Sequence, residues 1–501
     1  MYPGKEMRFL PVVVLALGML SWIACNKSGN AGQTAAAGDG GKIPITTKSE
    51  EAKKEFLQGR DLAEKLKAQE SVAHFDKAIA LDPDFATAEL ARANSSPTAK
   101  DFFEHLNKAI ALSANASEGE RLLILSNEAG ANGEVVKQKE YLDKLVALHP
   151  NDERALFNLG NYHFAQQEYE QAIAHYKKAT EVAPAYSPAY NILGYAYRQQ
   201  GDYKDAEQAF KKYIELIPND PNPYDSYAEL LLKMGRFDDS IAEYRKALAI
   251  DSYFVPSHFG ISADLMYLGK TNEATAELQQ MAGQARNDGE LRTAYFGMAV
   301  IAVDSGKLEQ ALQQIDKQHA VAEKKNDVAA MAGDLQVKGN ILAEMQRYDA
   351  AEQQFDRSLQ IVEGSSLSQA IKDNAQLQHH FNETVVAIGK KDLAAAKSHA
   401  EQYRAGAEVS KNPGQLKLAH ELAGRIALTQ KDYDTAITEL QQANEQDPRN
   451  LFRLSAAFHA KNDAAQAKQY CKRAAEFNSL PQLNYAFIRV KAKKTAAELK
   501  G

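Results

Sequence analysis

The first candidate for chemistry in this sequence is a tripeptide that resembles the end of a phosphate-binding loop. The tripeptide Gly269-Lys270-Thr271 has the residue types that close a phosphate-binding loop, in which backbone N–H groups and a lysine hold phosphate oxygens. Such a loop also requires a glycine five positions before Gly269, and that position holds Asp264. We therefore interpret the tripeptide as a turn between two helices and predict no nucleotide site.

Histidines give the next candidates, because they are common zinc ligands. His420-Glu421 opens the pattern of a zinc protease, but the position required for the second histidine holds Gly424. His379 and His380 are adjacent and would point about 100° apart on a helix, so they do not converge on one ion. We interpret them as a solvated pair. The sequence predicts no metal, no cofactor and no catalytic residue.

The two cysteines have separate explanations, and we expect no disulfide between them. Cys471 falls at a helix-packing position near the end of the chain, where a buried and unreactive thiol is expected. Cys25 instead follows an apolar leader. The sequence therefore assigns Cys471 to packing and leaves Cys25 for modification.

Residues 1–24 have the pattern of a secretory signal. Lys5 and Arg8 precede an apolar run that is too short for a membrane span. The run ends at Ala24-Cys25, which resembles a bacterial lipobox, although Trp22 stands where leucine is usual. The resemblance implies that Cys25 receives lipid. It places the protein at the bacterial cell envelope, as a periplasm-facing or outer-membrane lipoprotein exported across the inner membrane.

Other interpretations of the leader stay open. Cleavage near Ala35–Ala37 and an uncleaved anchor are two alternatives, and translation begins at either Met1 or Met7. Residues 25–48 are rich in Gly, Ala, Ser and Thr, and a stretch with so few large apolar side chains does not offset the entropy of folding. We expect a disordered tether over 25–48.

The rest of the chain must form an extended helical body. A length of 501 residues exceeds what one hydrophobic core usually serves. The amino-acid composition is rich in Ala, Glu, Gln, Lys and Leu, which favours helices. The net charge of −7 is small, and basic residues are mixed with acidic ones, so we expect no nucleic acid partner.

Self-similarity at an interval of 34 residues indicates how those helices are organised. Pro150, Pro184 and Pro218 follow one another at this interval, and glycines at 201, 235 and 269 mark a turn in the same register. Small residues recur at two further positions of each unit. They are Gly160, Gly194 and Ala228 at the first, and Ala172, Ala206 and Ser240 at the second.

This pattern resembles the tetratricopeptide repeat (TPR), a helix hairpin whose small residues allow close packing around a bulky side chain. The resemblance implies an all-α solenoid of about eleven or twelve stacked hairpins, because each hairpin buries its apolar face only against its neighbours. We expect an N-terminal array over 49–290, a more divergent C-terminal array over 291–481, and a capping helix with a basic tail over 482–501.

The resemblance also implies where a partner binds, since the first helix of each repeat faces a concave groove that holds peptides or partner helices. The corresponding candidates are Arg154, Phe157, Asn161, Phe164, Asn191, Tyr195, Arg198, Asp225 and Glu229. Aromatic members would anchor apolar side chains, and asparagines would bond a peptide backbone. Contact with neighbouring helices is the alternative interpretation of these aromatics.

Together these features predict a non-catalytic scaffold. It would bind other proteins at the envelope and touch the membrane only through its lipid. The alternative is a surface lipoprotein that binds a small ligand or a glycan. The only tryptophan is Trp22 in the leader, so a glycan site in the mature chain would lack the preferred stacking residue.

Overall fold

Many helices of this protein begin at residues whose side chains accept bonds from free backbone N–H groups, and several end at residues with a left-handed backbone. In this computed structural model, which describes residues 41–499, the Asp152 side chain accepts bonds from the backbone N–H groups of Arg154 and Ala155 and so caps α7 (Glu153–Ala165). Gly201 ends α9 (Ser187–Gln200) with a φ of 85°, which costs glycine little. Local capping therefore sets the hairpin boundaries.

The described residues contain α-helices, one short 3-10 turn at Ser113–Asn115, and no strand. In chain order the helices are α1 (Glu50–Glu64), α2 (Ala68–Leu81), α3 (Ala86–Asn94), α4 (Ala99–Leu112), α5 (Glu118–Ala131), α6 (Val135–Leu148), α7 (Glu153–Ala165), α8 (Tyr169–Val182), α9 (Ser187–Gln200), α10 (Tyr203–Leu216), α11 (Pro221–Lys233), α12 (Phe237–Ile250), α13 (Val255–Tyr267), α14 (Thr271–Gly283), α15 (Asp288–Asp304), α16 (Leu308–Lys325), α17 (Val328–Glu344), α18 (Tyr348–Glu363), α19 (Gln369–Lys390), α20 (Leu393–Ser410), α21 (Pro413–Gln430), α22 (Tyr433–Gln442), α23 (Pro448–Ala460), α24 (Ala464–Ala475) and α25 (Leu483–Glu498).

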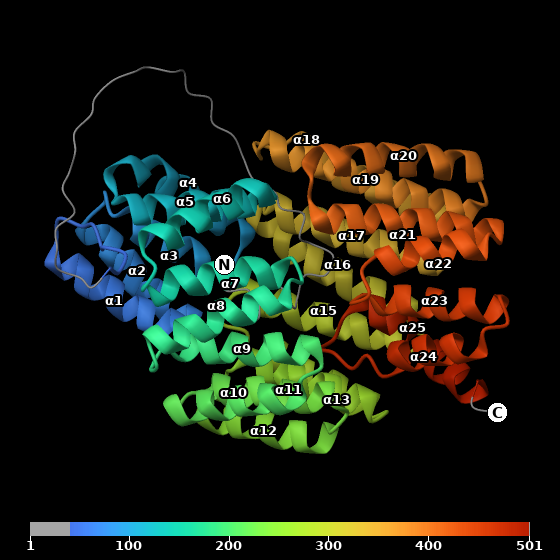
Figure 1. Cartoon of the computed structure of the whole chain (residues 1–501), viewed down its shortest axis with the longest axis horizontal. Coiled ribbons are helices and arrows are strands. Elements are labelled where there is room, and N and C mark those ends of the chain that lie inside the picture. The colour runs from blue at the N-terminus through green and yellow to red at the C-terminus, as the bar shows by residue number, and fades with distance from the viewer. Residues whose placement is uncertain (1–40, 500–501) are drawn as a thin grey trace.

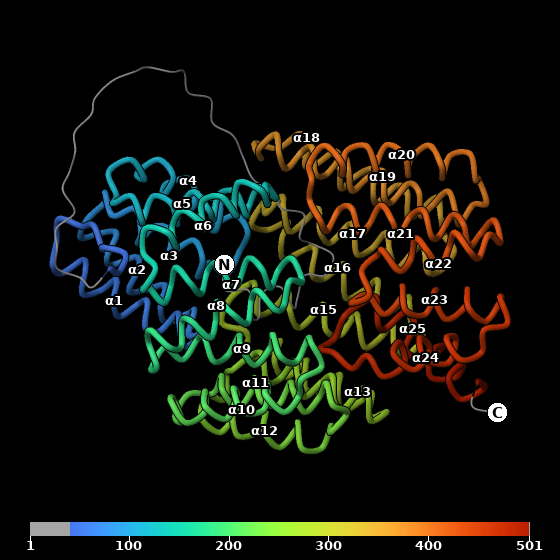
Figure 2. Tube along the Cα trace, viewed as in Figure 1, coloured from blue at the N-terminus to red at the C-terminus, as the bar shows by residue number. Residues whose placement is uncertain are grey.

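Consecutive helices pair into hairpins, from α1 with α2 through α23 with α24, and α25 follows as a single helix. Each hairpin also packs on the next one along the chain, as in a solenoid (Figures 1 and 2). The expected all-α solenoid fold is confirmed, and no helix within residues 41–499 combines the length and the apolar character that a membrane span requires.

The residues of the 34-residue register lie at the hairpin contacts. Gly160 on α7 faces the ring of Tyr176 on α8, and an added Cβ at Gly160 would lie 2.6 Å from that ring. Gly194 and Phe210 make the same contact one repeat later, at 2.7 Å. The small residues of the register are buried throughout, namely Gly160, Ala172, Gly194, Ala206, Ala228 and Ser240. Close packing of a small residue on a bulky one thus recurs along the axis.

The hydrophobic core has no break at the expected boundary between the two arrays. One cluster of buried side chains extends from Ala228 to Ala492 and includes Phe259 before position 290 and Phe296 after it. Helices α14 and α15, which flank that position, pack on each other. The repeats on either side of residue 290 therefore share one core.

The array winds far enough that parts distant in sequence meet. Helix α25 packs on α15 and α23 as well as on α24, and α17 packs on α4. Figure 1 shows α15, α16 and α17 between the N-terminal helices on one side and the C-terminal helices on the other. Successive turns of the solenoid are therefore in direct contact.

Two expectations about the ends require correction. The tether was expected to extend to residue 48, but residues 41–48 are fixed against the repeats by hydrogen bonds. The basic face expected on the C-terminal helix is partly inverted, because Arg489 is buried and Val490 is 55% exposed. The signal at 1–24, Cys25 and residues 26–40 lie outside the described part of the chain.

Candidate interaction surface

The predicted groove residues of α7 contact neighbouring parts of the array. The Arg154 guanidinium donates to Glu64 on α1 at 2.8 Å and lies over the Tyr186 ring, 5.2 Å from its centroid. Phe157 is 3% exposed and packs edge-on against the same Tyr186 ring. These side chains join repeats to one another in this structure.

The other two candidates on α7 differ in exposure. Asn161 is 7% exposed, and its Oδ1 accepts a bond of 2.8 Å from the Tyr176 hydroxyl. Phe164 is half-buried and packs edge-on against Tyr169, with the ring centroids 5.5 Å apart. Asn161 therefore combines a packing contact with a polar group at the inner face.

The candidates on α9 and α11 form a polar ladder between adjacent repeats. The Tyr195 hydroxyl donates to Glu229 at 3.2 Å, and the Arg198 guanidinium lies 3.5 Å from Glu229 and 4.6 Å from the centroid of the Tyr195 ring. Asp225 accepts a bond of 2.8 Å from Ser257 on α13. Asn191, between them, is buried.

The structure therefore places most of the predicted groove residues inside the protein. Phe157, Asn161, Asn191, Asp225 and Glu229 are all buried. The physical reason is the tight winding of the array, which brings the inner faces of successive helices together. The role of these residues in partner binding stays a prediction, whereas their expected exposure on an open groove requires correction.

A non-helical segment of the chain contacts the ends of α11 and α13. We call residues 476–482, between α24 and α25, the clasp. Lys233 at the end of α11 donates to the backbone oxygen of Phe477 and lies over its ring, 4.2 Å from the centroid. Tyr267 at the end of α13 donates to the backbone oxygen of Ser479. The array thus grips a peptide segment by its backbone.

Burial also changes the pKa of Lys233, a side chain that contacts the clasp. Burial lowers the pKa of Lys233 to about 7, and the positive charge of Arg198 acts in the same direction.

Beyond the clasp, Arg489 on α25 binds Asp304 on α15 through two hydrogen bonds, one of them 2.6 Å long, with both side chains buried. The C-terminal helix is therefore fixed to the middle of the array.

A second non-helical segment lies along the N-terminal repeats. We call residues 41–48 the strap. Its backbone N–H groups at Ile43 and Lys48 donate to Asp152 at 2.9 Å and Asp82 at 2.8 Å, and the N–H of Thr46 donates to a carboxylate on α5. The acceptors precede or begin the first helices of three successive repeats. The sequence indicated none of this, because carboxylates at helix starts are first explained as caps.

The inner space between the solenoid turns includes a cavity of about 640 Å³. Its walls come from α4 to α7 on one side and from α17, α19, α20, α21, α23 and α25 on the other, with Gln482 of the clasp. Hydrogen bonds cross between the two sides, from Asn374 to the backbone oxygen of Asn132 at 3.2 Å and from Gln167 to Asn444 at 3.0 Å. We call this cavity the chamber.

One cluster of potential metal ligands was missed from the sequence. Asp356 on α18 and His379 and Glu383 on α19 offer ligand atoms that all lie within 4.8 Å of one another. Burial, together with nearby carboxylates, raises the pKa of Glu383 to about 7. The four-residue spacing of His379 and Glu383 places them on one helix face, and that spacing was the available signal. His380 points elsewhere, toward His399.

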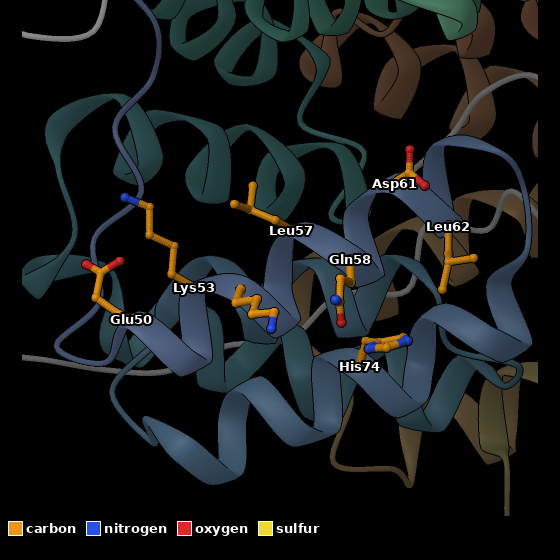
Figure 3. Close-up of a pocket in the computed structure, with 8 residues that line it drawn as sticks. Glu50, Lys53, Leu57, Gln58, Asp61, Leu62 and His74 are labelled. Carbon is orange, nitrogen blue, oxygen red and sulfur yellow. The ribbon is translucent and has the colours of Figure 1, made fainter.

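A wide depression lies on the outer side of the first hairpin and is drawn in Figure 3. Its volume is about 790 Å³, and its residues come from α1 and from His74 on α2. Glu50, Leu57 and Asp61 are exposed there, and the side chains in Figure 3 spread apart instead of converging. It lacks the opposing wall that encloses the chamber.

Cys471 has the environment that the sequence predicted. It is a free cysteine, fully buried, and its Sγ lies 3.4 Å from the backbone oxygen of Ala492. Burial raises the pKa of the thiol, which keeps it protonated and unreactive.

Fold and site together define an α-helical solenoid of hairpins that holds two non-helical segments of its own chain. Two family models described as tetratricopeptide repeats match the chain. One matches residues 139–188, 158–221 and 421–481, and the other matches residues 197–252. The chain therefore contains TPR repeats over these residues, as the sequence resemblance indicated. Such repeats form protein-interaction scaffolds that are generally not catalytic.

Solved TPR structures align with parts of the chain. A TPR protein from Parabacteroides merdae ATCC 43184 is 17% identical, with 52% of this chain and 98% of that chain covered and a TM-score of 0.35. YrrB, a TPR protein with an unusual peptide-binding site, is 21% identical, with 38% and 97% covered and a TM-score of 0.25. PilF of Pseudomonas aeruginosa is 19% identical, with 44% and 90% covered and a TM-score of 0.31. No curated protein matches the chain.

Proposed function

We propose that the protein is a non-catalytic scaffold that binds extended segments or helices of other proteins at the bacterial cell envelope, tethered there by lipid on Cys25. The observation that carries the docking role is that the array already holds two non-helical segments of its own chain. Both the clasp and the strap are held through backbone groups, by Lys233 and Tyr267 in one case and by acidic side chains in the other. Backbone recognition of this kind suits partners of varied sequence.

The inner face near the clasp is the part of the array that we propose for docking. Lys233 and Tyr267 provide donors for peptide carbonyl groups, and the Phe477 ring shows that an aromatic side chain fits beside them. Met234 is 39% exposed at the end of the same helix, so an apolar surface for a partner continues from the clasp to solvent. A partner would bind beside the clasp or in competition with it.

Site-specific photo-crosslinking in intact cells tests the docking role. A photoreactive phenylalanine analogue replaces Met234 beside the clasp in one variant. In the matched control it replaces Lys211 on the outer helix α10, whose side chain is 62% exposed. We expect discrete crosslinks to other proteins from position 234 and none of them from position 211. Identical products from both positions, or none from position 234, would contradict the docking role.

The envelope location is tested at the two cysteines. Cys25→Ala should abolish incorporation of a labelled fatty acid and release the protein from the membrane fraction. Cys471→Ala is the matched control, because that thiol is buried and should leave labelling unchanged. Undiminished labelling of Cys25→Ala would refute the lipid anchor while leaving the docking experiment unaffected.

A further inference from the structure

The chamber has an unusual composition for a space between helices. Nearly half of the residues that line it are Asn or Gln, although these two types make up about an eighth of the chain. They come from both walls. Examples are Asn158, Asn161 and Gln166 on the α7 side, and Asn340, Asn374 and Gln378 on the opposite side. An amide group carries donors and an acceptor at once, so this lining suits a ligand that does the same.

Some of these amides already bond to one another. Gln415 donates to Asn374 at 2.9 Å, and Gln378 donates to Asn382 at 3.0 Å. Asn161 differs from them, because its Nδ2 is buried and has no hydrogen-bond partner among the described residues. A buried donor without a partner is energetically unfavourable. The Asn161 side chain, already held by Tyr176, therefore presents the chamber with a donor that requires an acceptor.

Most charged residues of the chamber are bonded within the protein. Glu421 lies 3.3 Å from Arg425 and 2.9 Å from Arg453. Asp447 caps α23 and accepts a bond of 2.8 Å from Asn484. Lys417 donates to the side-chain oxygen of Gln167 at 2.7 Å. Side-chain amides outnumber the charged groups in the lining, so the lining favours a ligand that pairs with amides.

Aromatic rings complete the lining. Phe102 on α4 and Phe381 on α19 are half-buried and lie on opposite walls. Phe381 is held edge-on by Tyr403, with the ring centroids 5.7 Å apart. An aromatic face suits the C–H surface of a sugar ring, whereas an apolar ligand would leave the amides unpaired. The volume of the chamber lies within the usual range for small-ligand sites.

We propose that the chamber binds a neutral saccharide, a short oligosaccharide whose hydroxyl groups pair with the side-chain amides. Each hydroxyl donates and accepts, as each amide does, and Asn161 Nδ2 donates to one of its oxygens. A peptide fits less well. It presents a side chain at every residue, and the lining has more amides than aliphatic side chains with which apolar peptide side chains could pack. Gln482 at the end of the clasp is one of the residues that line the chamber, but the inference does not rest on the proposed docking role.

Isothermal titration calorimetry of the mature full-length protein tests the proposal. The probes are maltotriose, cellotriose, xylotriose and chitotriose, with acetyl-tetra-alanine amide as a peptide probe. We expect saturable binding of at least one trisaccharide and none of the peptide. Asn161→Asp, which removes the amide donor at constant size, should weaken that binding about tenfold or more.

Asn222→Asp is the matched control, since Asn222 is a buried asparagine at the start of α11 outside the chamber. It should leave the dissociation constant unchanged. If Asn161→Asp fails to fold by circular dichroism, Gln378→Leu at the opposite wall takes its place, with the same expected loss. The proposal is overturned if no trisaccharide binds, if the chamber variant and the control weaken binding equally, or if the peptide alone binds.

Discussion

The repeats of α7–α14 and those of α15–α21 solve the same packing problem with helices of different length. In the first region every helix has 13 or 14 residues, and the turns within three of its four hairpins use Gly201, Gly235 and Gly269 at positive φ. In the second region the helices have 16 to 22 residues, and the turns at Gln346, Lys391 and Lys431 have positive φ without glycine.

This difference shows that the left-handed turn belongs to the hairpin geometry and not to glycine. A non-glycine residue in that conformation costs about 1–2 kcal/mol. Longer helices bury more surface on their neighbours, and each additional Å² of apolar area contributes about 25 cal/mol. The second region uses such non-glycine turns in three of its hairpins, whereas the first region uses one, at Gln167.

The largest effect expected in this comparison comes from a charge placed at a helix contact. Ala206→Arg on α10 and Ala396→Arg on α20 each bury a guanidinium at a site with no solvent exposure. Each substitution should unfold the helices around it, because an unpaired buried charge costs more free energy than a few repeats contribute to stability. Limited proteolysis with mass spectrometry would locate the cleavage. Lys211→Arg on α10 is the exposed control. Cleavage of the same region in both arginine variants would contradict the expectation that each one disrupts its own repeats.

The next largest effect concerns the contact that joins the second region to the C-terminal helix α25. Asp304→Ala should lower the free energy of unfolding by about 3–5 kcal/mol, because it leaves the Arg489 charge buried and unpaired. Urea denaturation measures this loss. The exposed pair Lys212–Glu215 supplies the control, and Glu215→Ala should change stability by less than about 1 kcal/mol. Equal small effects from both variants would mean that α25 is held mainly by apolar packing.

The two regions also differ in how a buried acid makes stability depend on pH. Asp264 in the first region is fully buried, and burial raises its pKa to about 8, against a smaller opposing effect of the Ser240 hydroxyl. Asp334 in the second region is paired with Arg292 at 2.7 Å. Between pH 4 and 8 the folded protein holds a proton on Asp264 that the unfolded chain has released. Stability should therefore fall as pH rises through this window, by up to about 1.4 kcal/mol per pH unit.

Asp264→Asn should flatten that pH dependence and raise the melting temperature at pH 8. Asp334→Asn should instead lower it near neutral pH, since it leaves Arg292 without its carboxylate partner. Melting temperatures measured at pH 6, 7 and 8 distinguish the two. A wild-type profile that rises over this range, and is unchanged in Asp264→Asn, would contradict the raised pKa.

The smallest effect is an exchange of turn residues between the regions. Gly201→Lys should destabilise by about 1 kcal/mol, and Lys391→Gly should be close to neutral or slightly stabilising. Chemical denaturation of the two single variants measures both. Comparable destabilisation in both directions would show that the lysine at 391 contributes something beyond its backbone conformation.

The sequence was informative where one residue type signals one geometry. Glycine at a left-handed turn and a small residue opposite a bulky one revealed the repeats, the fold class and the approximate number of hairpins. Lys391 occupies the same backbone conformation without such a signal, and the register faded there. Burial of Tyr195 and Glu229 comes from a contact between adjacent repeats, which the sequence offered only as the alternative to an open groove. The chamber and the clasp arise from contacts between distant repeats, which the residues of one repeat do not encode.

The contact between Arg489 and Asp304 changes how the molecule loses its structure. An open stack of repeats frays from its ends, because its terminal hairpins have one neighbour instead of two. Here the last helix is wedged against a middle one, and the partners are 185 positions apart along the chain. The C-terminal end therefore has no free edge from which melting can spread, and the protein should acquire its full stability only after its last helix has been made.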